Sequence, residues 1–172
     1  SYSRLDEVEI TGNELDLILG QFAHHGERFY ENEVNRTKVI LLENENDFVA
    51  RNDLASAYIK LQQYEKAEAE FNENERCHPG KYETAANRGV LYKKMGKYEL
   101  AGDYLAESLK IKKEGHMGLG DYYLRMIKWL DKVEKNPDYL SNFLGVEYLA
   151  GSRATASSPL MNKEYLLTLI KN

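Results

Sequence analysis

A chain of 172 residues suits one domain that buries most of its apolar surface. Charged residues make up 30 % and hydrophobic residues 42 %, a composition that excludes disordered and collagen-like chains. The formal net charge of -5 argues against a nucleic-acid partner, because phosphate binding requires clustered lysine and arginine. No run of about 18 uncharged apolar residues occurs, so we expect no membrane insertion.

Cysteine usage narrows the possible chemistry further. The single cysteine, Cys77, excludes an internal disulfide and every metal site built from several cysteines. It does not fix the compartment in which the protein works. The chain begins at Ser1 rather than at a methionine, which leaves open whether a signal peptide or further repeats precede it.

The N-terminal part predicts a polar lead-in over residues 1–12 and a divergent repeat or cap over residues 13–47. A first helix is expected after Thr11 and Glu14, which have the spacing of a capping box. A His-His-Gly turn follows it. A second helix is expected over residues 27–43, where apolar residues recur at helical spacing.

The central stretch contains one pattern twice, over residues 48–81 and 82–115. The repeat period, about 34 residues, predicts a repeated helix–turn–helix unit. We expect paired helices over 48–61 and 64–77, then over 82–95 and 98–112. The matched positions are Tyr58 with Tyr92, Lys60 with Lys94, Tyr64 with Tyr98, Ala67 with Ala101, and Phe71 with Leu105.

These units resemble the tetratricopeptide repeat. The matching residues are Leu54, Ala55, Tyr58, Ala67, Phe71 and Pro79 in the first unit, and Gly89, Tyr92, Ala101 and Leu105 in the second. Small residues are expected where the two helices of a unit approach closely, and aromatic residues where units meet. Three positions depart from the family pattern: Arg51 and Ala85 stand where tryptophan is frequent, and Arg88 stands where leucine is frequent. We expect Arg88 either at an exposed edge or in the groove.

Residues 116–172 predict C-terminal capping helices over 117–134, 139–150 and 159–170. The whole chain is therefore expected to be all-α: an α-α superhelix of nine helices, with atypical ends that cap two clear repeats. An apolar set near the C-terminus either meets a partner or is buried when these helices fold back. Its members are Tyr122, Tyr123, Trp129, Tyr139, Phe143, Leu144 and Tyr148.

Residues 15–131 also resemble a group of exported bacterial tetratricopeptide proteins of unknown function. The resemblance rests on His25 and the Phe29-Tyr30 pair near the start, and on the helix expected after His116. It implies an exported or periplasmic location, with a cytoplasmic location as the alternative.

In the tetratricopeptide family the first helices of the units line a concave face on which peptides bind. Amides and lysines on such a face can bond an extended peptide or a carboxylate. The family's clamp for C-terminal carboxylates is not expected here, because only Asn87 fits its pattern. The resemblance implies a groove lined by Asn52, Ser56, Ile59, Lys60, Asn87, Val90 and Lys94, with Lys93 at a further groove position.

The spacing of the residues along the chain argues against two other candidate sites. The adjacent His24 and His25 point apart at a helix end and have no further ligand at a suitable distance along the chain, so no metal or cofactor is expected. Cys77 and His78 are also adjacent at a helix end, which rarely brings a base within reach of a thiol. We therefore expect no catalytic residue.

Together these patterns predict a non-catalytic scaffold that binds a protein or peptide segment on its concave face. The alternative is a homo-oligomerising module, a possible homodimer, whose apolar C-terminal helices pack on a second copy of the chain.

Overall fold

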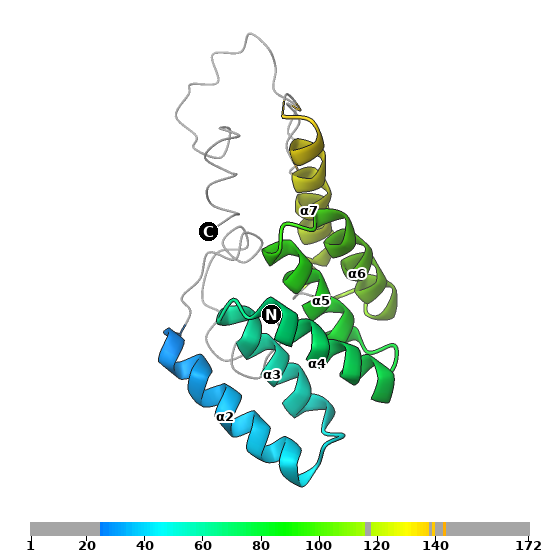
Figure 1. Cartoon of the computed structure of the whole chain (residues 1–172). Helices are drawn as coiled ribbons and strands as arrows, with labels where there is room; N and C mark the ends of the chain where they lie inside the picture. Colours follow the sequence, from blue (N-terminus) through cyan, green and yellow to red (C-terminus); the bar gives the residue numbers. More distant parts are fainter. Residues whose placement is uncertain (1–24, 116–117, 138, 140–142, 144–172) are drawn as a thin grey trace.

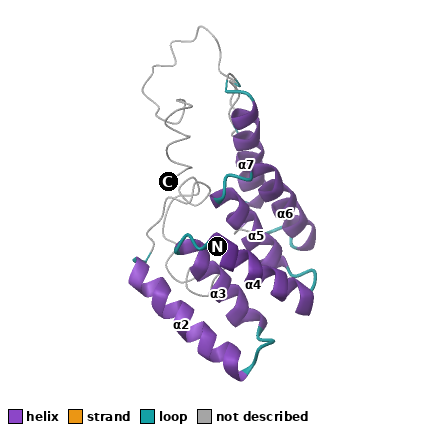
Figure 2. Ribbon diagram, viewed as in Figure 1, coloured by secondary structure: helices purple, strands orange, loops and turns teal. Residues whose placement is uncertain are grey.

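A computed structural model describes residues 25–115, 118–137, 139 and 143. Within these residues the chain forms six α-helices and no strand, as Figures 1 and 2 show. The predicted all-α class is therefore confirmed. The helices are α2 (Glu27–Glu43), α3 (Phe48–Lys60), α4 (Tyr64–Cys77), α5 (Tyr82–Lys94), α6 (Tyr98–Ile111) and α7 (Gly120–Lys135).

The observed helices begin and end close to the predicted bounds. The largest shift is at α7, which begins at Gly120 rather than at Met117. Gly118 has a φ of +80°, which a right-handed helix does not contain, and this explains the later start. The first helix, predicted after Thr11 and Glu14, and the helices predicted over 139–150 and 159–170 lie outside the described residues, apart from Tyr139 and Phe143.

Successive helices pack against each other in chain order, and α3 also contacts α5 directly (Figure 1). This alternation places α3, α5 and α7 in one layer and α2, α4 and α6 in the other. Such a two-layer stack of helix pairs is the packing of an α-solenoid, in which each unit buries its apolar face on its neighbours. The chain is a helical repeat array over the described residues.

The turns between paired helices have the same geometry in both units. Each first helix ends in a Schellman motif, in which Gln63 N–H bonds Tyr58 O at 2.9 Å and Lys97 N–H bonds Tyr92 O at 2.8 Å. The motif needs a residue with positive φ, and Gln62 (+57°) supplies it in the first unit. Gly96 (+73°) supplies it in the second. Asp47 is the N-cap of α3, and its carboxylate accepts the Ala50 N–H at 2.8 Å.

Small residues lie where the two helices of a unit meet. Ala67 and Ala101, one repeat period apart, are both 0 % exposed. A Cβ atom added to Gly89 on α5 would lie 3.3 Å from the Ala101 carbonyl oxygen and 3.4 Å from Leu105 Cβ, both on α6. The helices of this unit therefore approach so closely that a Cβ atom at position 89 would be crowded.

Large side chains fill the space between units. Tyr58 and Phe71 of the first unit share one buried cluster with Leu91 of the second. Tyr92 shares the other cluster with Leu105 and with Met126 of α7. Met126 follows Tyr92 by one repeat period and is fully buried in the same cluster, so α7 packs on the second unit.

A matched pair of glycine substitutions tests the close approach of α5 and α6. Gly89→Ala and Gly102→Ala both replace a glycine inside a helix, a change that by propensity stabilises by about 1 kcal/mol. At Gly102 the new methyl group meets only Ile127, at an ordinary 3.8 Å. We expect urea unfolding to show Gly102→Ala as more stable than Gly89→Ala by about 1 kcal/mol, since crowding at position 89 offsets the gain. Equal gains at the two positions would contradict the packing described here.

Candidate functional site

The residues predicted to form the groove lie on α3 and α5, which are adjacent in one layer. On α3, Asn52, Ser56, Ile59 and Lys60 follow the spacing of one helix face. On α5, Val90 and Lys94 stand one repeat period after Ser56 and Lys60. We call this surface the inner face. Its residues are Asn52, Ser56, Ile59, Lys60, Asn87, Val90 and Lys94.

Four of these residues form a buried floor: Asn52, Ser56, Ile59 and Asn87 are at most 4 % exposed. The Asn52 side-chain amide donates to the Thr84 hydroxyl of α5 at 3.5 Å and to the Phe48 carbonyl at 3.4 Å. It therefore links the two helices beneath the inner face. The helical register predicted which side of α3 these residues occupy, but it did not predict their burial.

Two oxygen atoms of the floor have no hydrogen-bond partner among the described residues. They are Asn52 Oδ1 and Ser56 Oγ, one helical turn apart, on side chains that are 3 % and 2 % exposed. A buried acceptor that is left unsatisfied costs about 1–3 kcal/mol. Native proteins retain few such atoms, and each calls for an explanation, which can be a functional one.

The other three residues form a rim that reaches the surface. Lys94 is exposed, whereas Lys60 and Val90 are half-buried. The Lys60 ammonium lies 5.9 Å from the centre of the Tyr30 ring on α2, within the range of a cation–π contact. The rim thus combines positive charge with a small apolar surface.

Lys93, beside the rim, has the most unusual electrostatic environment of the lysines in the described residues. Its ammonium lies 5.6 Å from the centre of the Tyr123 ring on α7. Burial, and to a lesser degree the charge of Lys94, lower the pKa of Lys93 to about 8. Burial also raises the pKa of the Tyr123 hydroxyl. The sequence placed Lys93 in the groove, but its desolvation follows from the packing of α7 on the array.

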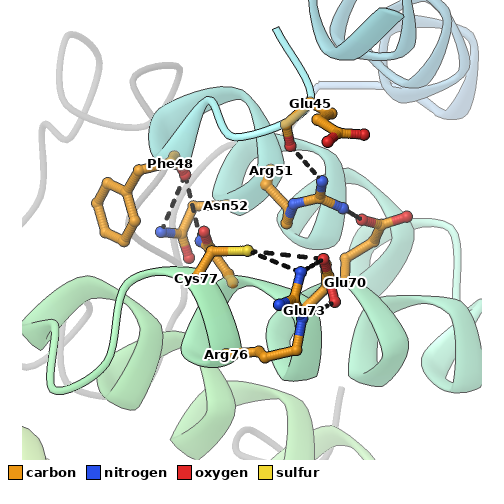
Figure 3. A network of polar contacts seen from close by, with 9 residues as sticks. Glu45, Phe48, Arg51, Asn52, Glu70, Glu73, Arg76 and Cys77 are labelled. Carbon is orange, nitrogen blue, oxygen red and sulfur yellow. Dashed lines mark hydrogen bonds and ion pairs between the residues drawn. The ribbon is translucent and has the colours of Figure 1, made fainter.

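The outer side of the first unit carries a polar network, shown in Figure 3. Arg51 pairs with Glu70 of α4 at 2.7 Å and donates to the Glu45 carbonyl, so it joins the α2–α3 loop to α4. Arg76 pairs with Glu73 at 2.6 Å, and this hydrogen bond lowers the pKa of the Glu73 carboxyl to about 2. Arg51, at a position where the family often has tryptophan, thus connects two helices by charge.

The same network holds Cys77. Its thiol lies 3.6 Å from Glu73 Oε1 and 3.2 Å from the Arg76 guanidinium. The adjacent His78 directs Nε2 to the Asn46 carbonyl at 2.8 Å and its ring edge to Phe48, so it is not aimed at the thiol. The arrangement is that of a helix end held by local contacts.

Arg88 occupies neither of the places expected for it. Its guanidinium donates to the Tyr104 hydroxyl of α6 at 2.9 Å and to Asn72 of α4. The half-buried side chain therefore bridges two helices of the outer layer, instead of standing free at an edge or in the groove. Beside it lies a cavity of about 180 Å³, lined by Glu75, Gly80, Lys81, Ala85, Arg88, Tyr104 and Glu107. The small side chain of Ala85, where the family often has tryptophan, leaves this space open.

Three further features concern metal binding, the histidines and membrane insertion. No cluster of three His, Cys, Asp or Glu residues suited to a metal ion occurs in the described part of the chain. There, His25 stacks on Phe29 with ring centres 3.9 Å apart; His24 and His116 lie outside it. None of the described helices has the length and apolar character needed to cross a membrane.

Two of the five described members of the C-terminal apolar set are buried within the single chain, and two more are half-buried. Trp129 and Phe143 are each 4 % exposed and contact each other, with ring centres 5.8 Å apart. Tyr139 packs on the same cluster, whereas Tyr122 is 43 % exposed. Leu144 and Tyr148 lie outside the described residues. The described members of this set therefore favour the fold-back arrangement over an open apolar surface.

The fold and the inner face define a class: an all-α array of helix pairs whose first helices form a continuous layer. Comparison with protein families gives that class a name. The family model described as tetratricopeptide repeat matches residues 49–73 and 82–114, which are α3 with most of α4, and α5 with α6. The central part of the chain, from α3 to α6, therefore consists of tetratricopeptide repeats. No curated protein and no solved structure matches it.

The low pKa of Lys93 leads to a prediction about pH and stability. The folded-state pKa, about 8, lies below the ordinary value of 10.5, so the folded state binds fewer protons between these values. Wild-type stability should therefore rise from about pH 8 upward, and below pH 8 the full cost of burying the charge remains. We expect Lys93→Met to stabilise the protein at pH 7 by on the order of 1–3 kcal/mol, with the gain shrinking as pH rises to 9.5.

The measurement is urea unfolding at a series of pH values below the range in which tyrosines ionise. Lys110→Met, at an exposed position on α6, is the matched control and should change stability little. A gain for Lys93→Met that stays constant with pH would show that the lysine charge is not desolvated.

Proposed function

We propose that this protein is a non-catalytic scaffold that binds a peptide or protein segment on the inner face. Tetratricopeptide repeats generally mediate protein–protein interaction, and the family match supports that general role. The observation that supports the choice of this face is that two buried oxygens without a donor, Asn52 Oδ1 and Ser56 Oγ, lie together on α3, whereas Asn74 Oδ1 is a single such atom on α4. A partner's backbone N–H groups are the donors that would satisfy them.

The division into floor and rim suggests how such a partner binds. Lys60, Val90 and Lys94 reach the surface and make the first contacts. The floor is buried in the structure, so a partner reaches its oxygens only when the face opens locally. Binding sites commonly belong to the less stable parts of a fold, where such opening requires little free energy.

The alternative, a module that pairs with a second copy through its C-terminal helices, lacks comparable support. Trp129 and Phe143, which it would use, are already buried within one chain. We therefore do not adopt it.

The first test is selection of binders from a random peptide display library on the full chain. Val90→Lys places a charge in the middle of the inner face, whereas Leu100→Lys makes the same kind of change at a 44 % exposed position on α6. We expect selected peptides to bind wild type and Leu100→Lys alike, and to bind Val90→Lys at least about ten-fold more weakly, since a charge buried under a ligand is unpaired. Peptides that are lost on Leu100→Lys but not on Val90→Lys would place the binding surface elsewhere.

The second test separates stability from binding at Ser56. Ser56→Ala removes a buried hydroxyl without a partner, whereas Ser108→Ala removes one that donates to the Leu105 carbonyl at 2.8 Å. We expect Ser56→Ala to be the more stable variant by about 1 kcal/mol, because it removes an unsatisfied group. Of the two variants, only Ser56→Ala should weaken the binding of the selected peptides. Loss of stability on Ser56→Ala, with unchanged binding, would mean that the hydroxyl serves the fold.

A further inference from the structure

The cavity beside Arg88 lies between α4, α5 and α6, and none of the inner-face residues lines it. Two pairs of residues form walls of this cavity: Ala85 and Arg88 on α5, and Tyr104 and Glu107 on α6. In each pair the residues are three positions apart, so both lie on the same side of their helix. Since α5 and α6 pack on each other (Figure 1), the two pairs face one space from neighbouring helices. The remaining lining residues, from the end of α4 and the turn that follows it, are Glu75, Gly80 and Lys81.

The size of this cavity limits what it can bind. Its volume is about 180 Å³. A water molecule takes about 30 Å³ in the liquid, so the space corresponds to about six waters. Pockets for drug-sized ligands are larger and measure about 300–1,000 Å³. The cavity therefore suits a ligand of about six non-hydrogen atoms, or one side chain of a partner protein.

Charges of both signs surround the cavity without pairing. The lining contains two carboxylates, of Glu75 and Glu107, and two cations, of Lys81 and Arg88. Within the described part of the chain, none of these four groups forms an ion pair. Both signs of charge are therefore available to a ligand in one small space.

The donors in the cavity belong to Arg88 and Tyr104. The Arg88 guanidinium donates to the Tyr104 hydroxyl at 2.9 Å and to Asn72, and both acceptors are neutral. A guanidinium has more donors than these two contacts use, and a carboxylate is its strongest partner because two parallel hydrogen bonds form. The Tyr104 hydroxyl proton has no acceptor among the described residues. A carboxylate bound here would therefore take donors from α5 and from α6.

Glu107 supplies the opposite charge. It lies about one helical turn from Tyr104 on α6, and its carboxylate has no hydrogen bond or ion pair with any described residue. Glu75 is less available, because its carboxylate already accepts a backbone N–H of the next turn at 2.8 Å. The Lys81 ammonium likewise lies 6.0 Å from the centre of an aromatic ring of α3. The groups open to a ligand are thus the donors of Arg88 and Tyr104 and the carboxylate of Glu107.

We propose that this cavity binds a small zwitterion, a free α-amino acid. Its carboxylate accepts hydrogen bonds from Arg88 and the Tyr104 hydroxyl, and its ammonium pairs with Glu107. A side chain of a partner protein carries one charge at most and would leave one of these groups without a partner, so a molecule with both charges fits better. The small side chain of Ala85 leaves room for the ligand. Because this site is separate from the inner face, the inference does not rest on the proposed function.

The first test compares three molecules of similar size by NMR chemical-shift titration of the full chain at neutral pH. L-Alanine carries both charges, propionate lacks the ammonium and L-alaninamide lacks the carboxylate. We expect L-alanine to bind in the millimolar range and the other two at least about five-fold more weakly, because each loses one charged contact. Absence of L-alanine binding, or equal binding of L-alanine and either analogue, would overturn the inference.

A pair of charge variants ties the binding to Glu107. Glu107→Gln removes the carboxylate proposed to hold the ammonium, and Asp103→Asn removes the same charge one turn earlier on α6, outside the lining. Both positions are exposed. We expect Glu107→Gln to weaken L-alanine about five-fold while leaving propionate unchanged, and Asp103→Asn to change either by less than about two-fold. Equal effects of the two variants on L-alanine would contradict the proposed site.

A pair of tryptophan variants tests the cavity itself. Ala85→Trp fills the space with the residue that tetratricopeptide repeats often have here, whereas Ala69→Trp adds the same side chain at an exposed position on α4. We expect Ala85→Trp to abolish L-alanine binding and Ala69→Trp to retain it. Circular dichroism establishes that each variant is folded, and if Ala85→Trp does not fold, the comparison at the exposed Glu107 decides. Unchanged binding by a folded Ala85→Trp variant would overturn the inference.

Discussion

The structure depends on how closely the two helices of a unit can approach. A single helix pair has more apolar surface than it can cover, so it is stable only when stacked between neighbours. Stacking in turn requires the backbones of the two helices in a pair to lie close together. Ala67 and Ala101 at 0 % exposure, with Gly89 against the Ala101 carbonyl, let the paired backbones come together. The room gained between units is then filled by Tyr58, Tyr92 and Phe71. The close contact within units and the large side chains between units therefore depend on each other.

This packing also leaves surface positions at which charged side chains can pair. The apolar contacts of a unit use the residues between its helices and between units, which leaves the outward positions of each layer unconstrained by the core. Arg76 and Glu73 form a short-range pair on α4, and Arg51 of α3 pairs with Glu70 of α4 between the two layers. The second of these pairs holds neighbouring helices together without taking part in the apolar packing.

How much of this could be predicted from the sequence varies with the kind of feature. The repeat period predicted the helices, because small and aromatic residues recur where the packing of each unit repeats. The period could not predict how deeply a face is buried. Asn52 and Ser56 lie on the side of α3 that register indicates, yet burial depends on which groups pack over that side. Arg88 shows the same limit: its place follows from Tyr104 and Asn72, two partners 16 residues away in opposite directions along the chain.

Buried polar groups on α3 and α5 lower the stability of the folded protein. The donor-free oxygens of Asn52 and Ser56 and the desolvated ammonium of Lys93 each lower the stability of the folded chain. All three groups lie on α3 and α5, two neighbouring helices of one layer. Their nearness on two adjacent helices is the reason to treat these separate costs together when the inner face is tested for binding.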